Sequence, residues 1–511
     1  MSEQFSYDEV TYPSMVFPHI RPDQIGAIAI LHGIRPDHIE DCRVLELGCG
    51  DGTNLLSIAY TMPRSHFVGL DLSAPRIEEA NTYARELGLS NCEFFHLDLL
   101  NFEPTKFGEF DFIIAHGVYS WVPEVVRERI LWIYEQSLKP NGVGFVSYNT
   151  YPGWHVREVA RNAMLFQTEP IVAPLEKVAN GLRFVEFLTQ ATTPDTLYRS
   201  LIEKQFEYLQ EKAPESIFHD DLGTFNQPFY FGQFVDHIEK AGLRFISELE
   251  PMSFFTDDLP PFAQEALEKI WDDPIRREQY LDLIRGRFFR STLVSKRSAD
   301  SSYRPISNTL SSLFLSSQSR AISLGAALGD DSVVAFSAPK GKEFETNHPL
   351  IKSLLELLGS QWPKRFSYSE VCESLKIESG GPDEVVFQSA ALRLISANIL
   401  EIRCFCPQIA LCVSERPKVS DFARWQADRG FALGDDHRGV TSVYGADVRL
   451  KNDLQASLVH FSDGSRTRSD IVDSVLKSLN EGPEMADVNT NLSDRIDSEF
   501  DFLLRVALLV G

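Results

Sequence analysis

The stretch Val44-Leu45-Glu46-Leu47-Gly48-Cys49-Gly50-Asp51-Gly52-Thr53 decides the fold of this chain. An apolar run leads into three glycines at alternate positions, and a helical pattern begins at Asn54. Glycine accepts backbone angles that other residues avoid, and it lets the main chain approach a ligand at the N-terminus of a helix. The spacing is G-x-G-x-G, and Thr53 stands where a dinucleotide-binding fold has its third glycine. The stretch therefore predicts a strand, a tight turn and a helix. Such a turn can bind a ligand or be only a turn, and the residues that follow decide between the two.

Strands and helices alternate along the chain after this turn. Further strands are predicted over residues 66–70, 93–97, 110–115 and 143–148, with helices over 73–87 and 125–138 between them. This alternation is typical of an α/β fold in which a mostly parallel sheet carries helices on both faces.

Polar side chains follow several of these predicted strands. Asp71, Asp98, His116 and Asn149 each come at or just after a strand end, as Glu46 does in the glycine stretch. Ligands of such sheets bind outside the carboxyl ends of the strands, and a carboxylate at about the position of Asp71 often grips ribose hydroxyls. A single carboxylate at a strand end is usually a helix cap, but several polar groups in succession predict a site for a nucleotide-like ligand.

The composition indicates a soluble globular protein of two or three domains. The chain has 511 residues, of which 43% are hydrophobic and 24% charged. The formal net charge is −24, so a nucleic-acid partner, which needs a basic surface, is not expected. The acidity favours either simple solubility or the attraction of a basic substrate such as a lysine-bearing protein.

The segments that target proteins to membranes or to secretion are not expected in this chain. The first ten residues contain no apolar segment, and no long apolar run is suited to crossing a membrane, so a cytoplasmic location is predicted. Seven cysteines along a long chain suit reduced thiols. Cys404, Cys406 and Cys412 match no zinc-binding spacing, and we expect no metal site.

Taken together, these residues resemble a class I S-adenosylmethionine-dependent methyltransferase. Glu46 to Gly52 is similar to the first motif of that family, Asp71 to its ribose-binding acid, and Asp98-Leu99 to its adenine-contacting pair. The resemblance implies a Rossmann-like sheet and S-adenosyl-L-methionine as the cofactor. The cofactor-binding residues that it implies are Glu46, Gly48, Gly50, Asn54, Asp71, Leu72, Asp98, Leu99 and His116.

Longer stretches are similar to one bacterial subgroup, in which a methyltransferase regulatory domain follows the core. They are Tyr7-Asp8-Glu9-Val10, His116 to Pro123, Ser147 to His155, Phe218 to Asp221, Asn226 to Phe231, Gln279 to Asp282 and Arg287 to Leu293. The subgroup includes rickettsial lysine methyltransferases that act on outer-membrane protein B. The resemblance thus implies a protein-lysine N-methyltransferase acting on a bacterial surface or outer-membrane protein. One departure is Asp51-Gly52-Thr53, where the subgroup tends to carry a small residue and paired glycines.

Aromatic residues near the strand ends are the candidates for the catalytic substrate channel. They can hold the apolar stem of a lysine and tolerate a methylammonium product through cation–π contact. The candidates are Tyr119, Trp121, Tyr151 and Trp154, with Tyr12 added from the N-terminal arm. Asn149 and His116 are expected to hydrogen-bond the amine or the cofactor. Any single aromatic among them can instead be a core residue.

Two other functions stay open beside lysine methylation. One is a small-molecule methyltransferase with a regulatory C-terminal half, and the other is a cofactor-binding scaffold without catalysis. The fourth strand ends in His116-Gly117-Val118-Tyr119 and lacks the Asn/Asp-Pro-Pro-aromatic motif of amide and base-amine methyltransferases. DNA, RNA-base and glutamine methylation are therefore disfavoured.

The chain is expected to divide into an N-terminal arm (1–40), a cofactor-binding core (41–155), a helical insertion or lid (156–240), the last core strands (241–297, with the regulatory-domain resemblance at about 215–297), a serine-rich linker (298–323) and a C-terminal substrate-docking region (324–511). In the last region, three helices and a hairpin of residues 399–403 with 409–413 predict a winged-helix-like α+β unit. Few basic residues lie on its third helix, so a protein partner is preferred to DNA. A homodimer is left open.

Overall fold

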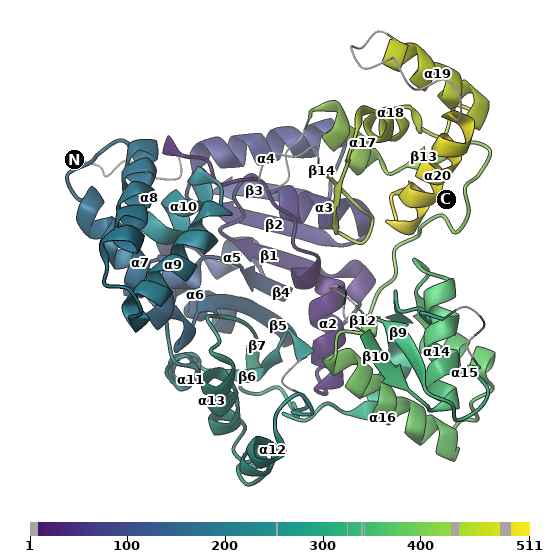
Figure 1. Ribbon diagram of the computed structural model, residues 1–511, viewed down its shortest axis with the longest axis horizontal. Coiled ribbons are helices and arrows are strands. Elements are labelled where there is room, and N and C mark those ends of the chain that lie inside the picture. Colours follow the sequence, from purple (N-terminus) through teal and green to yellow (C-terminus); the bar gives the residue numbers. More distant parts are fainter. Residues whose placement is uncertain are drawn as a thin grey trace.

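The computed structural model describes residues 9–251, 254–323, 325, 327–338, 341, 343–430, 439–480 and 492–511. Tyr7 and Asp8, which open the first stretch similar to the bacterial subgroup, lie outside these residues. Figure 1 shows a central sheet with a helical insertion at one end and two further units on the opposite side.

A seven-stranded sheet forms the centre of the molecule, with strand order β3-β2-β1-β4-β5-β7-β6. Its strands are β1 (Arg43–Leu47), β2 (His66–Asp71), β3 (Cys92–His96), β4 (Phe110–Ala115), β5 (Leu138–Asn149), β6 (Leu243–Glu248) and β7 (Phe289–Lys296). Strands β1 to β5 pair in parallel, whereas β7 runs antiparallel to both β5 and β6. The expected α/β class, with its mostly parallel sheet, is confirmed.

Helices cover both faces of this sheet. The first face carries α2 (Pro22–Leu31), α3 (Thr53–Thr61) and α4 (Ala74–Glu86), and the second carries α6 (Glu124–Ser137) and α11 (Phe231–Lys240). Strand side chains alternate between the two faces, so Val44 joins one core while Leu45 joins the other. The shorter helical segments of this part of the chain are η1 (Pro18–Ile20), η2 (Ile39–Asp41), η3 (Leu99–Asn101), α5 (Pro104–Phe107) and η4 (Tyr119–Trp121).

The helical insertion follows β5 and has a small core of its own, which includes Met164, Val185 and Ile202. Its helices are α7 (Gly153–Thr168), α8 (Pro174–Ala191), α9 (Leu197–Gln210) and α10 (Pro214–Leu222). Helix α11, which we placed in the insertion, buries Phe231 and Phe234 in the core of the sheet. Its apolar face therefore packs on the sheet. The helix is short, so its sequence pattern did not indicate which core it joins. After β6 come α12 (Pro261–Glu268) and α13 (Pro274–Arg285), which lead into β7.

The next unit packs beside α2 (Figure 1). It contains η6 (Ser307–Ser312), β8 (Phe314–Ser316), β9 (Val334–Ser337), β10 (Glu343–Thr346), α14 (Pro349–Ser360), β11 (Phe366–Ser367), α15 (Tyr368–Leu375), α16 (Pro382–Ser396) and β12 (Glu401–Arg403). The three expected helices are present. The serine-rich segment 298–323 is more than a linker, because it supplies η6 and β8 and buries Leu310 and Leu315.

The hairpin predicted in this unit is wrong. Strand β12 pairs with β8, which is also bonded to β11, so the three-stranded sheet has the order β11-β8-β12. The segment 409–413 lies against the end of the chain instead, where Ala410 N donates to Leu509 O at 3.0 Å. Apolar alternation indicates that a segment is extended but does not identify its partner strand.

The C-terminal unit has a separate core that contains Leu458, Ile471 and Phe500. It consists of β13 (Lys418–Val419), α17 (Asp421–Asp428), β14 (Gly439–Thr441), β15 (Asp447–Arg449), α18 (Asp453–Phe461), α19 (Arg468–Asn480), α20 (Leu492–Arg505) and β16 (Leu509–Val510). Helix α17 packs on α4, where Trp425 Nε1 donates to Glu86 at 2.9 Å and stacks edge-on against Tyr83. Among the described helices, none combines the length and the apolar character needed to cross a membrane.

Candidate active site

The parallel strands bring the predicted polar residues to one edge of the sheet. Glu46 lies near the end of β1, Asp71 ends β2, His116 follows β4, and Asn149 ends β5. Asp98 follows β3 and caps η3, where its carboxylate accepts from Leu100 N at 2.9 Å. Since the carboxyl ends of parallel strands meet at one edge, this edge is the candidate site.

The glycine stretch forms the expected tight turn between β1 and α3. Gly48 N and Cys49 N both donate to Leu70 O, at 2.7 and 3.1 Å, and Gly50 N donates to Asp71 Oδ2 at 2.8 Å. Gly48 has φ +75°, and a Cβ there would lie 2.6 Å from Val118, so only glycine fits. A Cβ at Gly50 would meet no atom of the described residues within 4 Å. The turn is thus held by its hydrogen bonds to Leu70 and Asp71, whereas the space beside Gly50 is open to a ligand.

Glu46 is buried with one carboxylate oxygen paired and the other free. Asn54 Nδ2 donates to Oε1 at 3.0 Å, while buried Oε2 has no partner within the described part of the chain. Burial raises the pKa of Glu46 to about 8, opposed by the Asn54 hydrogen bond and reinforced by Asp71 and Asp51. An unpaired buried carboxylate oxygen is costly, so this position favours a ligand that donates or carries positive charge.

Asp71 supports the turn with both carboxylate oxygens. Oδ2 accepts from Gly50 N, and Oδ1 accepts from Ser73 N at 2.8 Å. The neighbouring Leu72 is 45% exposed, and Leu99, beyond β3, is half-buried. Both apolar side chains therefore leave surface available to a ligand beside Asp71 and Asp98. Their assignment to the cofactor stays a prediction.

His116 is enclosed by aromatic rings and is neutral. Burial, and to a lesser degree His19, lowers its pKa to about 3. The ring of Phe17 lies 4.2 Å from the His116 ring, centroid to centroid. Its Nδ1 is buried with no partner among the described residues. A neutral imidazole with a free nitrogen is able to form one further hydrogen bond.

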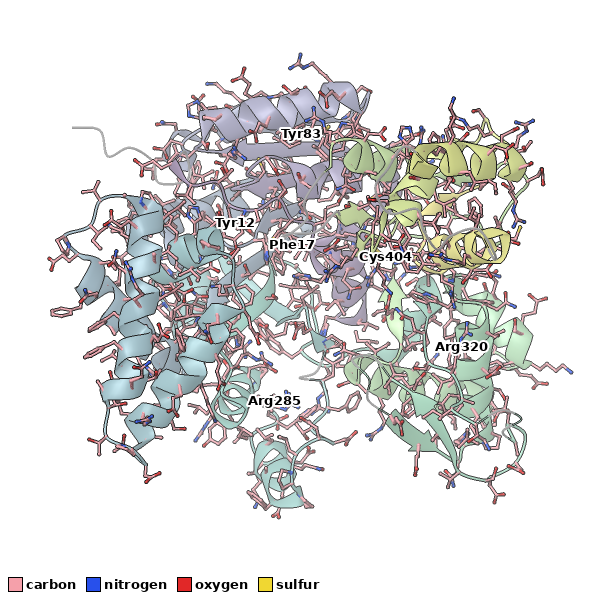
Figure 2. The ribbon with its side chains drawn as sticks, turned by 45° about the horizontal axis from the view of Figure 1, so that its top comes forward. Tyr12, Phe17, Tyr83, Arg285, Arg320 and Cys404 are labelled. Carbon is pink, nitrogen blue, oxygen red and sulfur yellow. The ribbon has the colours of Figure 1, made fainter. Side chains whose placement is uncertain are left out.

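The N-terminal arm crosses the glycine turn, which the sequence did not specify. Ser14 Oγ donates to Asp51, and Phe17 N donates to Asn54 Oδ1 at 3.1 Å. Farther toward the N-terminus, Val10 O lies 2.8 Å from His219 Nε2 of the insertion. Figure 2 shows the arm between the insertion and the sheet, with Tyr12 and Phe17 labelled. The arm thus joins the turn to the insertion.

Two of the five candidate channel aromatics are buried. Tyr119 has no exposed surface, its hydroxyl lies 2.5 Å from His237 Nδ1, and it packs against Phe234. Trp154 is 1% exposed and lies edge-on to Trp121, with ring centroids 6.0 Å apart. The prediction that Tyr119 lines a channel is wrong, because this motif residue faces the core under α11. The same prediction is wrong for Trp154, which is buried and packs against Trp121.

The other candidates keep surface near the edge of the sheet. Tyr12, Trp121 and Tyr151 are half-buried. The Tyr151 ring stacks on His155 at 4.0 Å, and its hydroxyl donates to Glu158 Oε1 at 2.8 Å. Burial raises the pKa of Tyr151 to about 12, and Glu158 adds to the shift. Tyr151 is therefore a neutral hydrogen-bond donor rather than a base.

The segment 149–154, which leads from the end of β5 into α7, is held by hydrogen bonds to distant parts of the chain. Asn149 Nδ2 donates to Asn226 Oδ1 at 2.9 Å, and its own N–H donates to Ser120 Oγ at 2.9 Å. The backbone N–H groups of residues 150 and 153 donate to the carbonyls of residues 288 and 287, at 3.0 and 2.9 Å, and N–H 151 donates to carbonyl 229 at 3.1 Å. The loop geometry therefore depends on residues 226–229 and 287–288.

A buried ion cluster anchors the second of these segments. Arg290, at the start of β7, bonds Asp282, Glu248 and Glu278 at 2.8, 2.6 and 3.0 Å, and its guanidinium lies 3.9 Å from the Phe231 ring. Burial alone would raise the pKa of Glu248, but the two arginines Arg290 and Arg287 hold it below its usual value. All four residues bonded in this cluster are at most 8% exposed. The sequence showed these residue types but not their contact.

Two family models match parts of this chain. A methyltransferase domain model matches residues 44–142, and a model described as a predicted methyltransferase regulatory domain matches residues 213–296. The uncharacterized protein RP789 of Rickettsia prowazekii is 35% identical over 289 residues, which are 56% of this chain and 52% of that protein. The uncharacterized protein RP028 of the same organism is 33% identical over 249 residues, 48% of this chain and 98% of that protein. The chain thus matches about half the length of RP789 and nearly all of RP028.

A solved structure is similar over almost the whole chain. PKMT2 from Rickettsia typhi superposes with a TM-score of 0.86 at 26% identity, covering 98% of this chain and 100% of that one. The structure of PKMT2 in complex with AdoHcy gives the same values. The glycine turn, the acids at the strand ends and both domain matches confirm the resemblance found in the sequence. The chain belongs to the class I S-adenosylmethionine-dependent methyltransferases that carry a methyltransferase regulatory domain, with S-adenosylmethionine as the cofactor.

Proposed function

We propose that this protein is a protein-lysine N-methyltransferase. The observation that carries the proposal is the likeness to PKMT2, a name that denotes a protein lysine methyltransferase, which extends through both C-terminal units and not only the cofactor core. A small acceptor needs little docking surface, whereas a protein acceptor makes use of an insertion and two further units.

The residues at the edge of the sheet fit the cofactor. Among the residues that the structure describes, Oε2 of Glu46 is buried without a partner, and the face of the turn at Gly50 is open. Glu46 and the Gly50 turn would hold the amino-acid part, while Asp71, Leu72, Asp98 and Leu99 would hold the ribose and adenine. When bound, S-adenosylmethionine supplies a methyl group activated by its sulfonium charge.

The protein contributes mainly by positioning the acceptor amine. Methyl transfer is an in-line displacement, so alignment supplies much of the rate. In the proposal, the half-buried Trp121 and Tyr151 flank the lysine stem, and Asn149 or the neutral His116 accepts or donates a hydrogen bond near the amine. A partly desolvated pocket lowers the pKa of a lysine amine, so no strong base is required.

The acceptor class is tested with labelled cofactor. The purified protein is incubated with methyl-labelled S-adenosylmethionine and a fractionated bacterial lysate, and protein and small-molecule fractions are counted separately. The resemblance to the rickettsial enzymes makes the envelope fraction the first to test. We expect label in protein, and we expect much less of it with Asp71→Asn when the cofactor is not saturating. Label confined to the small-molecule fraction would support the alternative of a small-molecule methyltransferase.

A further inference from the structure

A groove of about 1220 Å³ lies between the N-terminal arm, the insertion and the start of α4. Arm residues 9–14 form one wall, and residues 172–176 and 211–215, before and at the start of α8 and α10, form the other. Arg76 of α4 closes one side. The groove exceeds the usual volume of a small-molecule pocket, about 300–1,000 Å³, and its open form suits an extended chain.

The charge that lines this groove is negative. Glu9, Glu176, Glu211 and Glu215 line it, and within the described part of the chain none of these four carboxylates forms an ion pair or a side-chain hydrogen bond. The cations at the groove are already neutralised. Arg76 pairs with Glu79 at 2.8 Å. Lys212 pairs with Asp220 at 2.9 Å and with Asp221 at 2.7 Å.

Apolar surface lies beside these acids. Val172 is 89% exposed and Leu175 is 55% exposed, and both belong to the wall formed by the insertion. Isolated exposed apolar residues are ordinary, but here they line a groove beside unpaired carboxylates. The combination suits a polypeptide that has both basic and apolar side chains, because it offers ion pairs and apolar contacts together.

The arm that lines the groove also contacts the cofactor edge. Tyr12 and Ser14 line the groove, and Ser14 also donates to Asp51 of the glycine turn. Three residues on, Phe17 is bonded to Asn54 and packs on His116. A chain bound in the groove therefore lies against the same arm that crosses the turn (Figure 2).

We propose that this groove binds the basic segment of the acceptor protein that flanks the lysine to be methylated. The proposal rests on the proposed function and assigns the place where the acceptor chain docks. Charge complementarity selects a lysine-bearing segment, and nucleic acid is repelled by the same carboxylates.

The test measures binding rather than catalysis. The probe is a fluorescein-labelled peptide of alternating lysine and alanine, with a glutamate–alanine peptide as its counterpart, and binding is followed by anisotropy at low salt with S-adenosylhomocysteine present. The variant is the triple substitution Glu176→Gln, Glu211→Gln and Glu215→Gln. The matched control is Glu239→Gln, Glu373→Gln and Glu378→Gln, which removes the same charge from exposed residues elsewhere. Thermal unfolding and S-adenosylhomocysteine affinity show that both variants are folded.

We expect the groove variant to bind the lysine peptide about tenfold more weakly than the control variant. Added salt should weaken peptide binding less in the groove variant than in the control variant. The glutamate peptide should bind neither protein. Equal binding of the lysine peptide by the two variants, or no binding by the unaltered protein, would overturn the groove assignment. If groove-dependent binding is found but no lysine of any cell protein is methylated, the groove assignment stands and the proposed function fails.

Discussion

Replacing Arg290 by methionine should strongly destabilise the protein. The substitution keeps much of the side-chain volume beside Phe231 but removes the cation closest to the buried carboxyl groups of Glu248, Glu278 and Asp282. Arg287 remains as their shared cation, at the longer distances of 3.7, 4.0 and 3.4 Å. Removing one partner of a buried ion pair costs about 3–5 kcal/mol. For a folding unit of about 150–250 residues, each kcal/mol shifts the midpoint by about 2–4 °C, so the unfolding midpoint should fall by roughly 6–20 °C.

Arg285→Met is the matched control. Arg285 lies in the same helix–strand region (Figure 2), but it pairs with Asp258, whose side chain is 54% exposed. Such a pair contributes about 0–1 kcal/mol, so its loss should move the midpoint by at most about 4 °C. Differential scanning calorimetry of both variants at pH 7 measures the contrast.

The pH dependence of the Arg290 effect follows from Glu248. In the unaltered protein its folded-state pKa is lowered, so it contributes stability above the unfolded-state value of 4.5, which is lost as the pH falls through the folded pKa. Without Arg290, only Arg287 opposes the effect of burial, so the pKa of Glu248 rises and the buried charge can be removed by protonation. Burial already raises the pKa of Asp282 to about 6, and the loss of Arg290 shifts it further in the same direction. The deficit of Arg290→Met should therefore be largest at neutral pH and shrink toward pH 5. Equal midpoints for the two variants, or a deficit that does not change with pH, would refute the account of the cluster.

Three further outcomes follow from the site. Asp71→Asn should weaken S-adenosylhomocysteine binding roughly 10- to 100-fold in calorimetry, because a charged acceptor of the Gly50 N–H is lost. An affinity within twofold of that of the unaltered protein would show that the cofactor does not bind beside Asp71. The folded-state pKa of Glu46 is raised to about 8, so the ligand-free protein should lose stability as the pH rises from about 5 to 8. Glu46→Gln should make the thermal unfolding midpoint depend less on pH over this range. An unchanged pH dependence would show that Glu46 is ionised throughout. Tyr119→Phe removes the hydroxyl bonded to His237 and should cost about 1 kcal/mol of stability in urea unfolding, with the methyl-transfer rate unchanged. A loss of rate above tenfold would show that Tyr119 lines the substrate channel after all.

The sheet and the cofactor edge could be predicted because their signals are local. The glycine turn and the acids after β2 and β3 lie within a few residues of the strands that position them. Parallel topology then brings the strand ends together without further information. Gly48 and Asp71 are clear cases, since the turn conformation and the bond to Gly50 N both follow from the residue types.

The remaining features depend on contacts between distant residues. Tyr119 lies in a motif beside the site, yet its ring turns into the core because α11, more than 100 residues later, covers it. The arm contact of Ser14 joins residues 37 positions apart, and the bond from Arg290 to Glu248 joins residues 42 positions apart. No periodicity in the chain specifies such partners. The partner of β12 was missed for the same reason.

The most direct test of the central claim is tandem mass spectrometry of the labelled acceptor protein. The label is transferred from methyl-labelled S-adenosylmethionine, and the fragment ions assign it to one side chain. The account predicts methyl groups on the Nζ atom of lysine, flanked by further basic residues that suit the acidic groove. A label carried only by carboxylate, glutamine or arginine side chains would contradict it.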